Sequence, residues 1–109
     1  MIMEKGMVKL SVMYPNQDGK KFDLDYYCNQ HVGLVGKLLG AAVKSASVEK
    51  GLGGNAPDSP AVYIAIGNLY FESMDAFHKS FGPNADAIMG DLPNFTDIEP
   101  VVQISEIVI

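Results

Sequence analysis

The segment from Ala61 to Phe71, AVYIAIGNLYF, constrains the fold most, because it is apolar on both faces of a predicted strand. Val62, Ile64 and Ile66 alternate with a second set of apolar side chains, which is the pattern of an extended chain. A strand of this kind is buried on both of its sides. Any sheet that contains this strand therefore needs cover on two faces.

Three further segments have strand patterns. Residues 7–14 alternate between apolar and polar side chains, and residues 41–50 do so more weakly. Residues 101–109 form a C-terminal strand pattern, whereas residues 51–60 are rich in glycine and proline and predict a loop. The sequence therefore predicts four strands.

Two helical segments separate these strands. The first is predicted from Asp23 to about Leu39, and the second begins after Ser73 and is interrupted at Gly82-Pro83. The order β-α-β-β-α-β predicts an α+β fold of the ferredoxin-like plan, a four-stranded antiparallel sheet with both helices on one face. We expect one domain over residues 1–109, because this length is typical of a single domain.

The second face of the sheet lacks a cover within the chain, since two helices can cover only one side. The last strand is also apolar on both faces. One side carries Val101, Ile107 and Ile109, and the other carries Val102, Ile104 and Val108. A second copy of the chain is the simplest cover. The pattern therefore predicts a homodimer formed by sheet-to-sheet packing.

The first helix has clear start and stop signals. Asp23 can accept from the free amides of the first turn, and Phe22 and Tyr27 occupy the two positions of a hydrophobic staple. Gly40 follows the last apolar residue and is a stop signal. The segment FDLDYYCNQHVGL is therefore predicted to begin this helix.

His31 is on the apolar face of this helix. Leu24, Tyr27, His31, Leu34 and Leu38 are spaced by three and four residues, so they share one helical face. One interpretation is a core histidine bonded to a carbonyl or a tyrosine hydroxyl. The other is that His31 lines a pocket beside Tyr27 and transfers protons there, because imidazole gains and loses a proton near neutral pH.

The remaining polar candidates have simpler interpretations. Cys28 is expected to be an inert buried thiol on the flank of the pocket, and His78 is expected at the rim or in solvent. Asp91, Asn94 and neighbouring polar residues suit a turn, although Asp91 can also orient a histidine. Apolar side chains could line a ligand cavity or simply pack the core, and the candidates for substrate binding are Tyr26, Cys28, Leu34, Tyr63, Phe77, Phe81 and Phe95.

Composition excludes several classes of partner and site. The net charge is −5 and all eight basic residues are lysines, which argues against nucleic acid and anionic membranes as partners. The single cysteine permits no intrachain disulfide and no thiolate metal cage, and two distant histidines do not suit a metal site. Without a long apolar run or a signal-peptide pattern, we expect a cytoplasmic location.

The sequence resembles the EthD-type family, one of the dimeric α+β barrel families. The resemblance covers nearly the whole chain from about Met7, and the order and spacing of its motifs carry it. These motifs are Tyr14-Pro15, Phe22-Asp23, Tyr26-Tyr27, His31 with Leu34, Phe71-Glu72-Ser73 with Phe77, Asp91, Phe95-Thr96-Asp97 and a last strand ending around Glu106. One departure is Gly33, where the family often has proline in a His-x-Pro-Leu motif.

The resemblance implies a homodimer whose sheets form a barrel, with an apolar pocket beneath the helices. Members of the family accompany degradation of ethers and aromatic compounds, and relatives include decarboxylases, isomerases, cyclases, monooxygenases and haem enzymes. A family catalytic histidine would correspond to His31, followed by Tyr27 and Asp91. The loss of proline at Gly33 is expected to let the helix continue differently and to shift the pocket floor.

Three functional hypotheses follow. The first is a small enzyme without a cofactor or metal that acts on an apolar, aromatic or polyketide-like molecule, with His31, Tyr27 and Asp91 as catalytic candidates. The second is a binding or accessory protein for a hydrophobic compound. The third is a haem-binding barrel with His31 or His78 as axial ligand.

Overall fold

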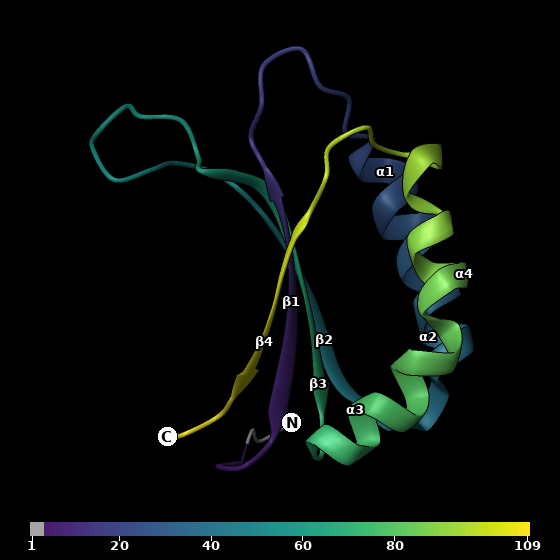
Figure 1. The fold of residues 1–109 in the computed structure, drawn as a ribbon. Coiled ribbons are helices and arrows are strands. Elements are labelled where there is room, and N and C mark those ends of the chain that lie inside the picture. The colour runs from purple at the N-terminus through teal and green to yellow at the C-terminus, as the bar shows by residue number, and fades with distance from the viewer. Residues whose placement is uncertain (1–3) are drawn as a thin grey trace.

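Four antiparallel strands form one sheet, and the helices lie on one face of it, in the computed structural model of the protein, which describes residues 4–109 (Figure 1). The strands are β1 (Val8–Pro15), β2 (Val43–Lys50), β3 (Tyr63–Phe71) and β4 (Val101–Glu106). Their order across the sheet is β2-β3-β1-β4, so the predicted ferredoxin-like α+β fold is confirmed. Of the predicted domain 1–109, residues 1–3 lie outside the described residues.

Three strands are shorter than the sequence predicts. β2 begins at Val43 rather than Ala41, because Gly40–Ala42 form a 3₁₀ turn. The other two are β3 and β4. β3 begins at Tyr63 rather than Ala61, because Tyr63 is paired with Pro15, the last residue of β1. β4 ends at Glu106 rather than Ile109, because Glu106 is opposite Val8, where β1 begins. The patterns locate both strands correctly, but the extent of the neighbouring strand decides where the ladder ends.

The first helical segment begins and ends where its signals predict. The Asp23 carboxylate accepts a hydrogen bond from the Tyr26 amide at 3.1 Å, and the rings of Phe22 and Tyr27 are 5.4 Å apart. The segment consists of α1 (Leu24–Tyr26), a π-helical turn (Tyr27–His31) and α2 (Val32–Leu39). Gly40 ends it with a φ of 56°, a left-handed conformation that favours glycine.

The π-helical turn changes which residues face the sheet. It contains one more residue per hydrogen-bonded ring than an α-helical turn, with the Val32 amide donating to the Tyr27 carbonyl. Tyr27 and His31 are buried as predicted, but Val35 and Leu39 are the buried residues further along. The predicted inner positions Leu34 and Leu38 are only half-buried, because the extra residue moves the later register by one. The helix continues through Gly33 in α2, and the irregular turn lies before it, at Tyr27–His31.

The second helical segment is interrupted where predicted. It consists of α3 (Met74–Phe81), a 3₁₀ turn (Gly82–Asn84) and α4 (Ala85–Gly90). Ser73 caps α3 by accepting from the Ala76 amide at 3.1 Å. No helix within residues 4–109 has the length and apolarity needed to cross a bilayer.

The core between helices and sheet has two parts. One contains Leu10, Val35, Phe71, Phe77 and Ile88, which join the sheet to α2, α3 and α4. The other contains Tyr14, Tyr27, Ala65, Leu92, Phe95 and Ile98, near the start of the first helix. Val12 packs against both parts. The two ends of the helical layer therefore rest on different sets of side chains.

The far face of the sheet, which we define as the face away from the helices, is less apolar than predicted. The register with β1 places Ile66 and Asn68 of β3 on this face, opposite Met13 and Ser11. Asn68 is 2% exposed, accepts from Ser11 and donates to Ser47 on β2, both at 3.2 Å. The prediction that β3 is apolar on both faces is therefore wrong at Asn68, where a polar row crosses the sheet.

We expect Asp23→Ala to lower the free energy of unfolding by about 1 kcal/mol, because it removes the cap of the first helix. Asp25→Ala is the matched control, since Asp25 is an exposed acidic residue of the same turn and is not the cap. Urea denaturation followed by circular dichroism measures both. Equal losses in the two variants would contradict a capping role for Asp23.

Candidate active site

His31 is buried at the end of the π-helical turn, with 5% of its surface exposed. Its ring lies nearly parallel to that of Tyr27, with centroids 5.5 Å apart and an angle of 18°. Phe95 packs on it from the loop before β4, with ring centroids 4.8 Å apart. These contacts fix the plane of the imidazole.

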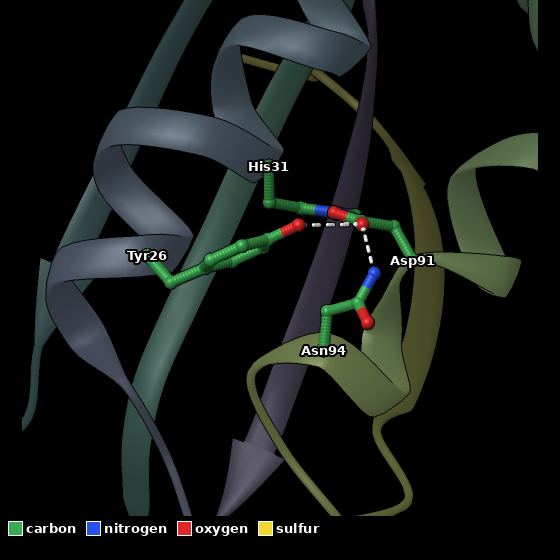
Figure 2. A network of polar contacts seen from close by, with 4 residues as sticks. All are labelled: Tyr26, His31, Asp91 and Asn94. Atoms are coloured by element: carbon green, nitrogen blue, oxygen red, sulfur yellow. Dashed lines mark hydrogen bonds and ion pairs between the residues drawn. The ribbon is translucent and has the colours of Figure 1, made fainter.

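Asp91, which follows α4, holds the imidazole from the second half of the chain. Its Oδ2 is 2.9 Å from His31 Nδ1, while its Oδ1 accepts from the Tyr26 hydroxyl at 2.9 Å (Figure 2). Asn94 Nδ2 donates to the same Oδ1 at 2.8 Å. Three side chains therefore converge on one carboxylate, and the meeting of Asp91 with a histidine, which the sequence left open, is observed.

The loop that carries Asp91 is fastened to the start of the first helix. The Asp23 amide donates to the Phe95 carbonyl at 2.8 Å, and Thr96 Oγ1 donates to the Lys21 carbonyl at 2.6 Å. The Lys21 amide in turn donates to Asp97 Oδ1 at 2.7 Å. Each bond ends on a backbone group of the segment before the helix, so these bonds hold the Asp91 loop against the helix start.

The π-helical turn lets two residues of one helix reach the same carboxylate. Tyr26 and His31 are five positions apart, which in a regular α-helix of 3.6 residues per turn separates side chains by about 140°. A wider π turn reduces this separation, because its hydrogen bonds span five residues. Tyr26 and His31 can therefore both point at Asp91, as Figure 2 shows.

The hydrogen bonds keep Asp91 ionised. Burial alone would raise the pKa of its carboxyl group, but hydrogen bonds from Asn94, His31 and Tyr26, together with the charge of His31, outweigh burial and hold the pKa below its ordinary value. The same contact with Asp91 raises the pKa of the Tyr26 hydroxyl. Tyr26 therefore remains a neutral donor to a charged acceptor.

The ionised state of Asp91 decides the tautomer of His31. A carboxylate can only accept, so Nδ1 carries the hydrogen of the 2.9 Å bond and donates it. In the neutral ring, Nε2 is then the nitrogen with a free lone pair. Nε2 forms no hydrogen bond within residues 4–109. Because no buried side-chain nitrogen or oxygen of these residues lacks a partner, Nε2 is not buried, and it is open to the space that His31 lines.

That space is a cavity between the helices and the sheet. The space inside it that a water-sized molecule can occupy is about 60 Å³, and about 570 Å³ is free of atoms when the open mouth is included. Tyr14, Tyr27 and His31 line it together with apolar residues of β1, β3, α2 and α4, such as Val12, Leu69, Val35 and Ile88. The arrangement provides one proton-accepting nitrogen on the wall of a mainly apolar chamber.

Tyr27 lies over Gly67 of β3, and a Cβ atom at Gly67 would overlap its hydroxyl. Burial raises the pKa of Tyr27 to about 12, although interaction with the Tyr14 hydroxyl opposes this. Burial also raises the pKa of Tyr14, and Tyr27 adds to that shift. Both phenols are therefore neutral at ordinary pH, and each can donate a hydrogen bond.

The structure brings some predicted site residues together and separates others. Phe81 lines the cavity with His31 and Tyr27, and Phe95 packs on the imidazole. Phe77 lies in the other part of the core, and Tyr63 lines a separate hollow beside the loop after β2. Leu34 is half-buried on α2.

Cys28 is exposed, so the prediction of a buried thiol is wrong. It directly follows Tyr27, whose side chain faces the sheet, and the π-helical turn directs the next three positions to solvent. His78 is exposed, as predicted, beside Phe77. Among residues 4–109, no group of three His, Cys, Asp or Glu side chains is placed to hold a metal ion.

Sequence reasoning missed two contributors to the site. Asn94 was interpreted as a turn residue, but it also donates to Asp91. Its spacing of three from Asp91 was the available signal, because a 3₁₀ turn brings such residues close. Gly67 is the second contributor, and a glycine within an apolar strand is itself a sign of close approach by another group.

Comparisons with known proteins identify the family and the fold of this chain. The EthD domain family matches residues 16–99. A crystal structure of an EthD-like protein from Ralstonia eutropha is similar, with 40% identity, a TM-score of 0.89 and coverage of 97% of this chain and 96% of that one. None of the curated proteins matches this chain.

Two more distant structures share the fold. A hydroxynitrile lyase from Passiflora edulis is 18% identical, with a TM-score of 0.66 and 95% of each chain covered. A dimeric ferredoxin-like protein of unknown function from Thermobifida fusca is 14% identical, with a TM-score of 0.61 and coverage of 98% of this chain and 96% of that one. At these identities the likeness concerns the fold alone.

We expect Asp91→Asn to lower the free energy of unfolding by about 1–2 kcal/mol near pH 7, because an amide accepts less strongly than a carboxylate. The folded-state pKa of Asp91 lies below the unfolded value of about 3.9. Its contribution is therefore present above about pH 4 and is lost as pH falls through the folded-state pKa. The difference in the free energy of unfolding between variant and wild type should therefore shrink below about pH 4.

Urea denaturation between about pH 7 and about pH 3 measures this difference. Asp86→Asn is the control, since Asp86 is an exposed residue of α4 and its replacement removes the same charge. A difference for Asp91→Asn that stays constant below about pH 4 would contradict the assignment of an ionised, hydrogen-bonded carboxylate.

Proposed function

Because this chain belongs to the EthD domain family, we propose that it is a small enzyme that transfers a proton to or from an apolar molecule bound beneath its helices. The chemistry is carried by the protein's own side chains and needs no metal or organic cofactor. The substrate class is an aromatic or otherwise apolar compound of catabolism, ether degradation included, or of secondary metabolism. A cytoplasmic location accords with the single cysteine, which permits no intrachain disulfide.

The observation that carries this proposal is the buried His31–Asp91 pair beside the cavity. The 2.9 Å contact at Nδ1 orients the imidazole and leaves Nε2 directed to the open space. A base held by a carboxylate at its other nitrogen is the arrangement used in many proton-transfer sites. In this proposal His31 is the catalytic base and Asp91, Tyr26 and Asn94 are positioning residues.

The reaction step is a proton transfer at a carbon next to a carbonyl group. Nε2 takes the proton, the electrons of the broken C–H bond form a C=C bond, and the carbonyl electrons move to oxygen. The Tyr27 hydroxyl, which is neutral and lines the same cavity, donates a hydrogen bond to that oxygen. Return of the proton from Nε2 regenerates the enzyme. The hydroxynitrile lyase of Passiflora edulis is one enzyme with this fold.

Two alternatives use the same cavity differently. A binding or accessory protein would hold an apolar compound without turnover, and the apolar wall of the cavity is compatible with that role. Haem ligation by His31 would use Nε2, since Nδ1 is bonded to Asp91, whereas His78 lies exposed on α3. A Soret band on titration with haemin would favour haem ligation.

A homodimer formed through the far face completes the proposal. Met13, Ile64 and Ile66 lie half-buried on or near this face, and Val101 is 46% exposed beside them on β4. The Thermobifida fusca protein with this fold is described as dimeric. A second copy would cover these side chains, and the polar row through Asn68 would fix how the two sheets align.

We expect the wild-type protein to accelerate hydrogen–deuterium exchange in D₂O at the acetyl methyl group of 4-methylacetophenone, which is next to the carbonyl. His31→Ala should lower the exchange rate by about 100-fold or more. Asp91→Asn should lose part of it, because the base is then poorly oriented. His78→Ala is the matched control, since it removes the only other histidine of the chain, which is exposed. Proton NMR measures the exchange rate.

Saturation-transfer NMR on the same samples shows whether the ketone is bound. Binding with exchange no faster than in His31→Ala would overturn catalysis and favour the binding protein. Circular dichroism of each variant establishes that the fold is retained.

We expect light scattering to give the mass of a dimer at micromolar concentration, and Ile66→Asp to give a monomer with an unchanged circular dichroism spectrum. A charge on the far face would be buried without a partner in the dimer but solvated in the monomer. Asn29→Asp adds the same charge on the exposed side of the first helix and should remain dimeric. A monomeric wild-type protein would overturn the proposal.

A further inference from the structure

We infer that the cavity selects an uncharged molecule with one oxygen-bearing end and an apolar body, and that it rejects carboxylates and other anions. The inference rests on the proposed function, because it names the substrate class of the same site. It concerns charge and polarity in the cavity, which can be tested by binding alone.

No permanently charged cation lines the cavity among residues 4–109. None of the chain's eight lysines is a lining residue, and the chain has no arginine. Within these residues the ionisable side chains of the wall are Tyr14, Tyr27 and His31. An anion that entered would leave water without meeting a fixed positive charge, and burial of an unpaired charge is strongly unfavourable.

The nearest fixed charge has the wrong sign for an anion. Asp91 is 2.9 Å from His31, directly behind the ring, and its side chain is 13% exposed, so its charge is only partly screened by water. The other groups around His31 are neutral donors, Tyr26 at Asp91 and Tyr27 at the cavity wall. A carboxylate at Nε2 would therefore face a second carboxylate across the imidazole.

The polar groups of the cavity gather at one end. Tyr14 and Tyr27 belong to the part of the core that packs on Phe95, which also contacts His31. The opposite end belongs to the other part, with Leu10, Val35 and Ile88 on the wall. Asn68 and Ser47 also border the cavity, but the Asn68 side chain belongs to the polar row of the far face, where it donates to Ser47. A ligand that matches this wall has one end that accepts a phenol hydrogen bond and a remainder that is apolar, as in an aryl or alkyl ketone, aldehyde or ester.

Three probes of similar size separate charge from shape. They are 4-methylacetophenone, methyl 4-methylbenzoate and 4-methylbenzoate, which share one ring and differ in whether the oxygen-bearing end is charged. Dissociation constants from NMR titration of the full-length protein give the comparison. The ketone and the ester should bind at least about 30-fold more tightly than the carboxylate, which corresponds to an unpaired charge in a partly open cavity.

A substitution that adds a positive charge at the cavity mouth tests whether charge causes the weak binding of carboxylates. Met89 is a cavity residue of α4 that is 38% exposed, so a lysine there reaches the mouth of the cavity without burying its charge. Met89→Lys should improve binding of 4-methylbenzoate by about 10-fold and leave the ketone within about 2-fold. Met89→Leu is the matched control, which should change neither.

Carboxylate binding as tight as that of the ester in wild-type protein would overturn the inference. Equal effects of Met89→Lys and Met89→Leu on the carboxylate would also count against it, because charge would then not be the cause. These outcomes differ from a failure of the proposed function, in which a bound ketone shows no His31-dependent exchange. If the protein binds the neutral probes selectively but exchanges no protons, the inference about charge holds and the proposed enzymatic function is wrong.

Discussion

The hydrogen bond between His31 and Asp91 is the interaction on which the candidate site depends. It joins the first helical segment to the loop after the second, over a separation of 60 residues, at 2.9 Å. The bond does two things at once, because it fixes the imidazole and selects which nitrogen faces the cavity. Tyr26 and Asn94 support it by holding the other carboxylate oxygen. Without these donors, burial would favour a protonated carboxyl group and the orientation of the histidine would be lost.

The surrounding fold provides this bond with a rigid frame. Backbone bonds tie Asp23 to Phe95, so the helix start and the Asp91 loop cannot separate independently. Gly67 lets Tyr27 approach the sheet, and the π-helical turn aligns Tyr26 and His31 on a common target. Each of these features costs some stability in isolation, since glycine weakens a strand and a π turn is rare. Gly67 and the π-helical turn lie around one cavity, which favours a functional role for these features over ordinary core packing.

Local signals predicted much of the fold and little of the site's geometry. The caps at Asp23 and Ser73, the stop at Gly40 and the interruption at Gly82 depend on neighbouring residues, and the sequence identified all four. The inward direction of His31 also followed from spacing. The π-helical turn did not, because a spacing rule assumes 3.6 residues per turn, and so Val35 replaced Leu34 on the inner face and Cys28 was misplaced. The contact with Asp91 and the polar row through Asn68 depend on pairing between distant segments, which a single sequence does not specify.

The separation of the paired residues has a consequence for how the protein acquires its chemistry. Tyr26 and Asp91 are 65 residues apart and His31 and Asp91 are 60 apart, so neither half of the chain contains the assembly. Contacts of this range require closure of a long loop, which is entropically costly and slow compared with forming a helix. A nascent or partly folded chain can therefore have its first helix, with His31 in place, and still lack the oriented base. The His31–Asp91 bond forms only when the two halves of the chain have docked, so its presence is a marker of that docking.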